Sequence, residues 1–121
     1  EIMLATIEGK LFNTSLEWSE DATVGVVLAS NGYPGEYSKE VPLDYLDALK
    51  DDILVFHGGT KYSYNELSGQ QRMVTNGGRV ITLVGKGETL DHARKKVYSN
   101  LNRVKFKGLY YRTDIAIGNS I

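Results

Sequence analysis

The residues of this sequence that could bind a ligand are concentrated in two glycine-containing segments. Asn31 to Tyr37 holds two glycines and one proline and directly follows the apolar run Thr23 to Ser30. A sharp loop is therefore expected at the end of a buried strand. Such loops often carry binding residues, although a simple connection would show the same pattern. Thr75 to Gly78 is a second turn signal, because Asn and Gly tolerate the positive φ angles of tight turns.

The motifs of common phosphate-binding and nucleophilic enzymes do not occur in this sequence. Gly85-Lys86-Gly87 fits neither the Walker-type phosphate loop nor the GxGxxG dinucleotide pattern, and the neighbouring Glu88 would repel a phosphate. His57 and His92 stand far apart with no carboxylate at metal-binding spacing. We interpret His57 as a structural histidine, with a catalytic role as the alternative. The absence of cysteine removes thiol chemistry and thiolate metal sites.

Length and composition indicate one globular domain. The chain has 121 residues, of which 41% are hydrophobic and 24% charged, as in ordinary globular proteins. Its 14 basic and 15 acidic residues give a net charge of −1, so we expect no nucleic-acid or membrane partner. The lack of cysteine fits a reducing compartment such as the cytoplasm. The sequence begins at Glu1, inside a helical pattern and without an initiator Met, so it is expected to be a piece of a longer protein.

The elements that must position these loops centre on residues 71–103. Strands at 72–74 and 79–84 around the turn at 75–78 predict a hairpin. Gly85 to Glu88 is expected to break the second strand, and Thr89 to supply the N-cap of a helix. The basic side chains of this helix are interpreted as a solvent-exposed face. Its predicted buried stripe consists of Leu90, Ala93, Val97, Leu101 and Val104.

The remaining segments predict shorter elements on either side of this unit. A helix within Glu1 to Leu11 is too short to be stable alone and must dock on something. The run Thr23 to Ser30 predicts a strand buried on both faces. The further expectations are a short helix at Val41–Leu49, a strand at Ile53–His57, a polar excursion at Lys61–Gly69 and a last strand at Phe106–Arg112. Together they predict an α+β domain with a mainly antiparallel sheet and helices packed on one side.

Four blocks of the sequence resemble, in order, the C-terminal domain of the phosphoribosylamine–glycine ligase family (glycinamide ribonucleotide synthetase). They are Val27–Tyr37, Val55–Thr60, Thr75–Val80 and Tyr111–Ile115. Glu8 to Leu11 and Trp18 are similar to the segment that joins this domain to an ATP-grasp core. Two departures concern the loops: Lys39 is followed by Glu40 where the family usually has Gly, and Ala116 follows Asp114-Ile115 where the family has Gly.

The resemblance implies a ligase of purine biosynthesis that joins glycine to 5-phosphoribosylamine with ATP and Mg²⁺, through a glycyl phosphate. In that family the nucleotide and the metal are bound by the ATP-grasp core, whose Arg-Phe-Gly-Asp-Pro-Glu signature is absent here. The C-terminal domain closes over the reaction centre and helps to hold the acceptor. Residues 1–20 would then be the linker helix and connector from the core, and residues 21–121 the C-terminal domain, inactive alone. The alternative is a non-catalytic small-ligand or protein-interaction module with the same fold.

The resemblance also implies a set of acceptor-binding residues and no catalytic or metal-binding ones. Within this set, Arg79 is the expected phosphate ligand, because a guanidinium can bind phosphate with two parallel hydrogen bonds. An ordinary exposed arginine at a strand end is the alternative, and Arg112 could take the same role. The full set is Tyr33, Pro34, Gly35, His57, Gly59, Thr60, Asn76, Gly77, Gly78, Arg79, Arg112 and Asp114.

Overall fold

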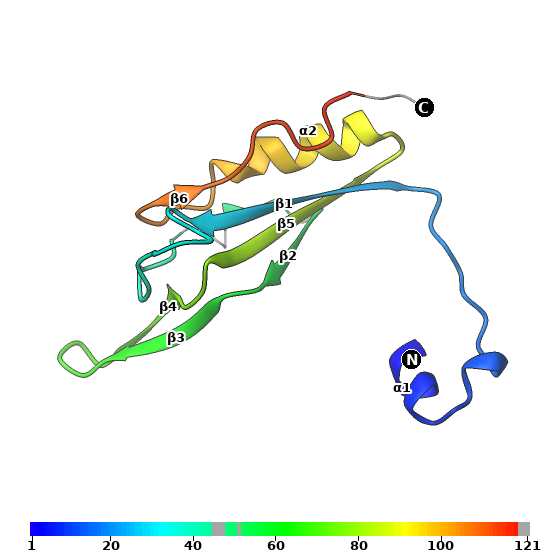
Figure 1. Cartoon of the computed structure of the whole chain (residues 1–121), viewed down its shortest axis with the longest axis horizontal. Coiled ribbons are helices and arrows are strands. Elements are labelled where there is room, and N and C mark those ends of the chain that lie inside the picture. The colour runs from blue at the N-terminus through cyan, green and yellow to red at the C-terminus, as the bar shows by residue number, and fades with distance from the viewer. Residues whose placement is uncertain (45–47, 51, 119–121) are drawn as a thin grey trace.

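The computed structural model describes residues 1–44, 48–50 and 52–118 and shows an antiparallel sheet covered on one face by a helix (Figure 1). The sheet has the strand order β2-β5-β1-β6, and its neighbouring strands are all antiparallel. The helix is α2, Leu90–Leu101. The fold class predicted from the sequence is therefore confirmed. The four strands are β1 (Ala22–Ser30), β2 (Ile53–His57), β5 (Arg79–Gly87) and β6 (Leu109–Tyr110).

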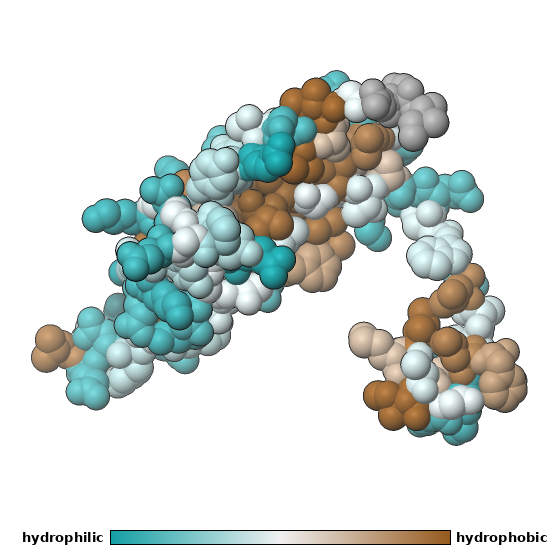
Figure 2. Space-filling view, in the orientation of Figure 1, coloured by the Kyte–Doolittle hydropathy of each residue, from teal (hydrophilic) through white to brown (hydrophobic). Residues whose placement is uncertain are grey.

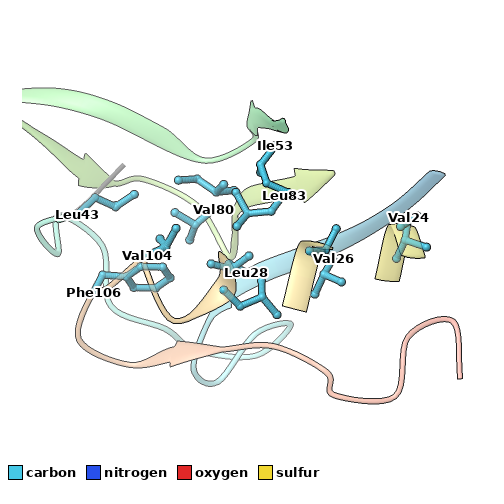
Figure 3. Packing of buried hydrophobic residues seen from close by; sticks show 13 residues of the cluster. Val24, Val26, Leu28, Leu43, Ile53, Val80, Leu83, Val104 and Phe106 are labelled. Atoms are coloured by element: carbon cyan, nitrogen blue, oxygen red, sulfur yellow. The ribbon is translucent and has the colours of Figure 1, made fainter. Parts of the chain in front are cut away.

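The hydrophobic core lies between this sheet and α2 (Figure 3). In β1 the residues Val24, Val26 and Leu28 are buried, and they stand opposite Gly85, Leu83 and Ile81 of β5. Burial of each such Leu or Ile side chain contributes about 1.5–3 kcal/mol. The side chains between them point to the other face of the sheet, which α2 does not cover. The prediction that this strand is buried on both faces is therefore wrong for the described residues.

Helix α2 begins and packs as its sequence predicts. The Oγ1 of Thr89 accepts a hydrogen bond from the amide of His92 at 3.2 Å, and Ala93, Val97 and Leu101 are buried. Leu90, the first residue of the predicted stripe, is instead 44% exposed.

The predicted break at residues 85–88 is wrong, because β5 continues through Gly87. A glycine is needed at residue 85 because helix α2 packs directly on it. A Cβ on Gly85 would stand 2.9 Å from the carbonyl oxygen of Ala93 and 2.9 Å from Cγ2 of Val97. The glycine thus allows the helix to approach the sheet closely, and it does not end the strand.

The predicted hairpin between residues 72–74 and 79–84 is also wrong. The first of these strands belongs to β4 (Gln70–Thr75), which pairs with β3 (Thr60–Asn65) in a separate two-stranded sheet. The predicted polar excursion at Lys61–Gly69 is therefore β3 and its turn, where Oδ1 of Asn65 accepts bonds from the amides of residues 67 and 68. The β3–β4 hairpin projects as an arm from the main sheet (Figure 1), and residues 76–78 carry the chain from one sheet to the other.

Two further elements differ from their predictions. The helix expected at Val41–Leu49 does not form at its start, because Pro42 and Asp44 make isolated antiparallel bridges to Val74 and Lys105. Residues 45–47 of that prediction lie outside the described residues. The last strand is limited to β6, since it pairs with β1 through Ala29 and Ser30 alone.

The first twenty residues form a body apart from the sheet (Figure 1). It contains the short helix α1 (Ile2–Ile7) and the 3₁₀ helix η1 (Leu11–Asn13), neither of which buries a residue. Many of its side chains are apolar (Figure 2). The aromatic side chains of Phe12 and Trp18 are each 84% exposed. In the part of the chain that the structure describes, no helix has the length and hydropathy that a membrane crossing requires.

Candidate functional site

Three loops that are distant in sequence meet around one hollow at an end of the main sheet. We call it the Arg79 hollow; its volume is about 410 Å³. Its walls come from the uncovered face of β1 and β5, from the loop after β1, from the turn after β2 and from the segment before β5. The lining residues are Val27, Tyr33, Gly58, Gly77, Gly78, Arg79 and Thr82.

Backbone hydrogen bonds fix these loops to one another. The amide of Ser30 donates to the carbonyl of Gly78 at 2.8 Å, and its Oγ donates to the carbonyl of Gly77 at 3.3 Å. On the other side, the amides of Gly58 and Gly59 both donate to the carbonyl of Val80 at 3.0 Å. A rigid frame of main-chain bonds therefore places the side chains at the hollow.

Tyr33 and Gly78 form the tightest contact of the site. A Cβ on residue 78 would stand 2.0 Å from Cδ2 of Tyr33, so the tyrosine ring lies directly against the glycine backbone. The ring of Tyr37 approaches that of Tyr33 in an edge-on manner, with 6.2 Å between the centroids. The two tyrosines thus form an aromatic wall along the loop at 31–37.

Arg79 provides the positive charge of the hollow. It is the first residue of β5 and is exposed. Within the described ranges its guanidinium makes no hydrogen bond or ion pair with another side chain, unlike Arg72, which binds Asp44 at 3.0 Å. A guanidinium in this state retains all its donors for a ligand with anionic oxygens.

The predicted residues of the first three blocks fall on or beside this hollow. Tyr33, Gly77, Gly78 and Arg79 line it. Pro34 and Gly35 belong to the same loop as Tyr33, residues 31–37. Gly59 and Asn76 follow or precede lining residues in the chain, and the amide of Asn76 donates to the carbonyl of Gly59 at 2.7 Å. His57 and Thr60 do not line the hollow; they contact each other, with 3.0 Å between Nδ1 and Oγ1.

The last block lies at a second hollow, next to the first. This Arg112 hollow has a volume of about 200 Å³ and is lined by Gly25, Val26, Val27, Arg112 and Ile115. The two hollows share Val27, so the residues that the sequence placed in one site occupy two neighbouring positions on the sheet. Nε of Arg112 donates to Oδ1 of Asp114 at 2.8 Å, and this hydrogen bond lowers the pKa of the Asp114 carboxyl below its ordinary value.

Sequence reasoning missed Val27, Thr82 and Gly58 as lining residues. Val27 and Thr82 stand opposite each other in the register of β1 and β5, a pairing that the sequence pattern did not predict. In addition, a strand assumed to be buried on both faces has no free face to search. Among residues 1–44, 48–50 and 52–118, no three His, Cys, Asp or Glu side chains gather where they could hold a metal ion.

Comparisons with known proteins agree with one another. A family model described as the C domain of phosphoribosylglycinamide synthetase matches residues 23–118. The chain is 51% identical over 100 residues to the phosphoribosylamine–glycine ligase of Halalkalibacterium halodurans. This alignment covers 83% of this chain and 22% of the relative. It is 42% identical over 118 residues to the ligase of Caldanaerobacter subterraneus, covering 98% of this chain and 27% of that protein.

A solved structure leads to the same family. The crystal structure of the phosphoribosylamine–glycine ligase of Thermotoga maritima aligns with a TM-score of 0.70 at 32% sequence identity, over 95% of this chain and 27% of that one. The chain thus spans about a quarter of the length of the curated relatives it matches. These findings confirm the resemblance of the four blocks, and the chain belongs to the family of phosphoribosylglycinamide synthetase C domains.

Proposed function

We propose that this chain forms the acceptor side of a ligase that joins glycine to 5-phosphoribosylamine in purine biosynthesis, in the cytoplasm. In this role it closes over the reaction centre and holds the phosphate of the acceptor. The names of the matched relatives support the proposal, since both are phosphoribosylamine–glycine ligases. Because the chain spans about a quarter of their length, the activity is assigned to a longer protein, and these residues alone are expected to form no product.

The observation that carries the proposal is the Arg79 guanidinium, which has no side-chain partner within the described ranges and stands at the edge of a hollow walled by glycines. A phosphate monoester carries close to two negative charges near neutral pH, and a planar guanidinium can bind two of its oxygens at once. Gly77 and Gly78 line the hollow with main-chain atoms only, and the ring of Tyr33 occupies the space that a side chain on Gly78 would need. The ribose would then lie against the ring of Tyr33.

ATP and Mg²⁺ are assigned to an ATP-grasp core outside these residues. The described part of the chain lacks a cluster of metal-binding side chains, and the sequence lacks a phosphate loop, so neither group fits here. ATP would supply the activation of the glycine carboxylate in that core. The contribution of this chain is to bind and orient the acceptor and to exclude water from the closed site.

Two apolar surfaces support docking on such a core. The uncovered face of the sheet exposes Val27, Leu54 and Phe56 by 39%, 43% and 56%. The first twenty residues expose apolar side chains as well (Figure 2). Exposed apolar surfaces of this kind mark interfaces, and the longer relatives contain the additional chain that could cover them.

The substitution Arg79→Ala in the full-length ligase tests this function. A hydrogen bond to a charged group is worth about 1.5–3 kcal/mol, so the Michaelis constant for phosphoribosylamine should rise roughly ten- to hundredfold. The Michaelis constant for ATP should change little. Lys86→Ala, an exposed residue near the far end of the same strand, is the matched control. Normal use of phosphoribosylamine, or an equal loss for ATP and acceptor, would contradict the proposal.

The alternative function is a small-ligand or protein-interaction module that has kept the fold without the chemistry. The sequence preceding residue 1 in the parent gene decides between the two. Magnesium-binding carboxylates of an ATP-grasp core there would support the ligase, and a parent without such a core would support the module.

A further inference from the structure

We propose that Arg94 and Tyr98 of α2 are positioning residues for acceptor binding, which hold the turn at 112–115 so that Arg112, paired with Asp114, stands at the hollow beside Val27. This inference rests on the function proposed above. The sequence placed Arg94, with the other basic side chains of this helix, on a solvent-exposed face and assigned no role to Tyr98.

Both side chains form hydrogen bonds with the backbone of this turn. Nε of Arg94 donates to the carbonyl of Ile115 and its second terminal nitrogen to the carbonyl of Thr113, each at 2.9 Å. The hydroxyl of Tyr98 donates to the carbonyl of Arg112 at 2.7 Å and accepts from the amide of Ile115 at 3.1 Å. Four hydrogen bonds therefore connect two helix side chains to the backbone of three residues of the turn, Arg112, Thr113 and Ile115.

The two residues also support each other. They are four positions apart in α2 and so lie on the same side of the helix. The Arg94 guanidinium carbon stands 4.4 Å from the centroid of the Tyr98 ring, within the range of a cation–π contact. This stacking orients the planar guanidinium, which can then serve two carbonyls at once.

The turn needs such support because it lies outside regular secondary structure. Strand β6 ends at Tyr110, so no strand ladder holds the described residues that follow, 111–118. Just after the turn, the amide of Ile117 donates back to the carbonyl of Asp114 at 3.3 Å, a long bond. The side chains of α2 thus provide the shorter bonds that fix the backbone on either side of Asp114.

The consequence is a second charged group at a fixed place beside β1, at the Arg112 hollow. Arg112 lines the hollow that shares Val27 with the Arg79 hollow. An acceptor whose phosphate binds Arg79 would meet Arg112 and Asp114 through its other polar groups. Arg94 and Tyr98 touch neither hollow and act through the turn.

The test uses Tyr98→Phe and Arg94→Ala in the full-length ligase, with Lys95→Ala as control. Lys95 pairs with Asp91 on the helix surface. Tyr98→Phe keeps the ring and removes both hydrogen bonds of the hydroxyl. The Michaelis constant for phosphoribosylamine should rise roughly three- to tenfold, that for ATP should stay constant, and exchange of the Ile115 amide with solvent should become faster. Arg94→Lys keeps the charge and should recover part of the loss.

A double substitution separates positioning from a merely structural role. If Tyr98 acts through Arg112, Tyr98→Phe should have no further effect on acceptor binding in an Arg112→Ala background. Unchanged acceptor use in both α2 variants, or equal losses for ATP and acceptor, would overturn the inference. If Arg79→Ala weakens the acceptor while the α2 variants do not, the inference fails and the proposed function stands. If Arg79→Ala leaves the use of phosphoribosylamine normal, the proposed function fails, and this inference fails with it.

Discussion

The ring of Tyr33 occupies the space that a side chain on residue 78 would need, since a Cβ there would stand 2.0 Å from Cδ2 of the tyrosine. Residue 78 belongs to the segment that joins the two sheets, whereas residue 33 belongs to the loop after β1. This contact therefore forms one wall of the Arg79 hollow. It also brings together two of the four sequence blocks, Val27–Tyr37 and Thr75–Val80.

The first prediction concerns this contact. Gly78→Ala should displace the Tyr33 ring, which can turn toward solvent because it is 43% exposed. We expect a loss of stability of about 1 kcal/mol, at the low end for overpacking, and a shift of the Tyr33 ring resonances in NMR spectra. In a Tyr33→Ala background, Gly78→Ala should reduce the stability by less than it does in the wild-type chain. Unshifted ring resonances would show that the ring does not lie on residue 78.

The second prediction compares two glycines on opposite faces of the sheet. A Cβ on Gly85 would press on the Ala93 carbonyl at 2.9 Å, whereas a Cβ on Gly25 would meet Cγ2 of Val84 at 3.4 Å, an ordinary contact. Gly85→Ala should therefore reduce the free energy of unfolding by about 1–3 kcal/mol. Gly25→Ala should change it by about 0.5 kcal/mol or less. Urea unfolding measures both, and equal effects would contradict the close approach of α2.

The third prediction concerns the buried stripe of α2. Leu101 is 1% exposed, so Leu101→Ala should lower the free energy of unfolding by about 2–5 kcal/mol. Lys95 lies on the outer face, where its ion pair with Asp91 is exposed, and Lys95→Ala should cost about 0.5 kcal/mol or less. Comparable losses at the two positions in denaturant titrations would mean that the helix presents another face to the sheet.

The sequence predicted the elements whose signals are local. Thr89 and the spacing of Ala93, Val97 and Leu101 depend on neighbours within the helix, and the structure confirms them. The pairing of strands could not be predicted in this way. Asn76 to Gly78 looks like a hairpin turn, but the strands on either side of it pair with different partners.

The same limit explains what was missed at the site. Arg94 appeared to be one of several basic residues on an exposed helix face, because its partners, the carbonyls of Thr113 and Ile115, lie about twenty positions away and carry no side-chain signal. Likewise, Gly85 looked like a strand break because the helix that needs it comes later in the chain. Local patterns cannot show contacts that arise from tertiary packing.

The fourth prediction concerns the pH dependence of the turn at 112–115. The pKa of the Asp114 carboxyl is lowered from its ordinary value of 3.8, first by the hydrogen bond from Arg112. A carboxyl whose pKa is lowered in the folded state stabilises that state above the ordinary pKa, and the contribution is lost as the pH falls through the lowered value. NMR titration should give a midpoint for Asp114 below 3.8.

The matched variants for this titration are Arg112→Ala and Lys107→Ala. Arg112→Ala removes the donor and should return the Asp114 midpoint toward 3.8. Lys107→Ala changes a nearby exposed charge outside the turn and should leave the midpoint in place. An Asp114 midpoint that does not respond to Arg112→Ala would show that the two side chains do not form a fixed charged pair at the Arg112 hollow.

The last prediction concerns the uncovered face of the sheet. Phe56 is 56% exposed and stands opposite Thr82 on this face, so Phe56→Ala should change the stability of the isolated 121 residues by about 0.5 kcal/mol or less. In the full-length protein a docked core would bury the ring, and the same substitution should then cost about 3 kcal/mol or more. Tyr62→Ala, at a residue 64% exposed on the β3–β4 arm, is the control. Thermal unfolding of the four variants gives the comparison. If Phe56→Ala costs as little in the full-length protein as in the isolated chain, this face of the sheet is not where the remaining chain docks.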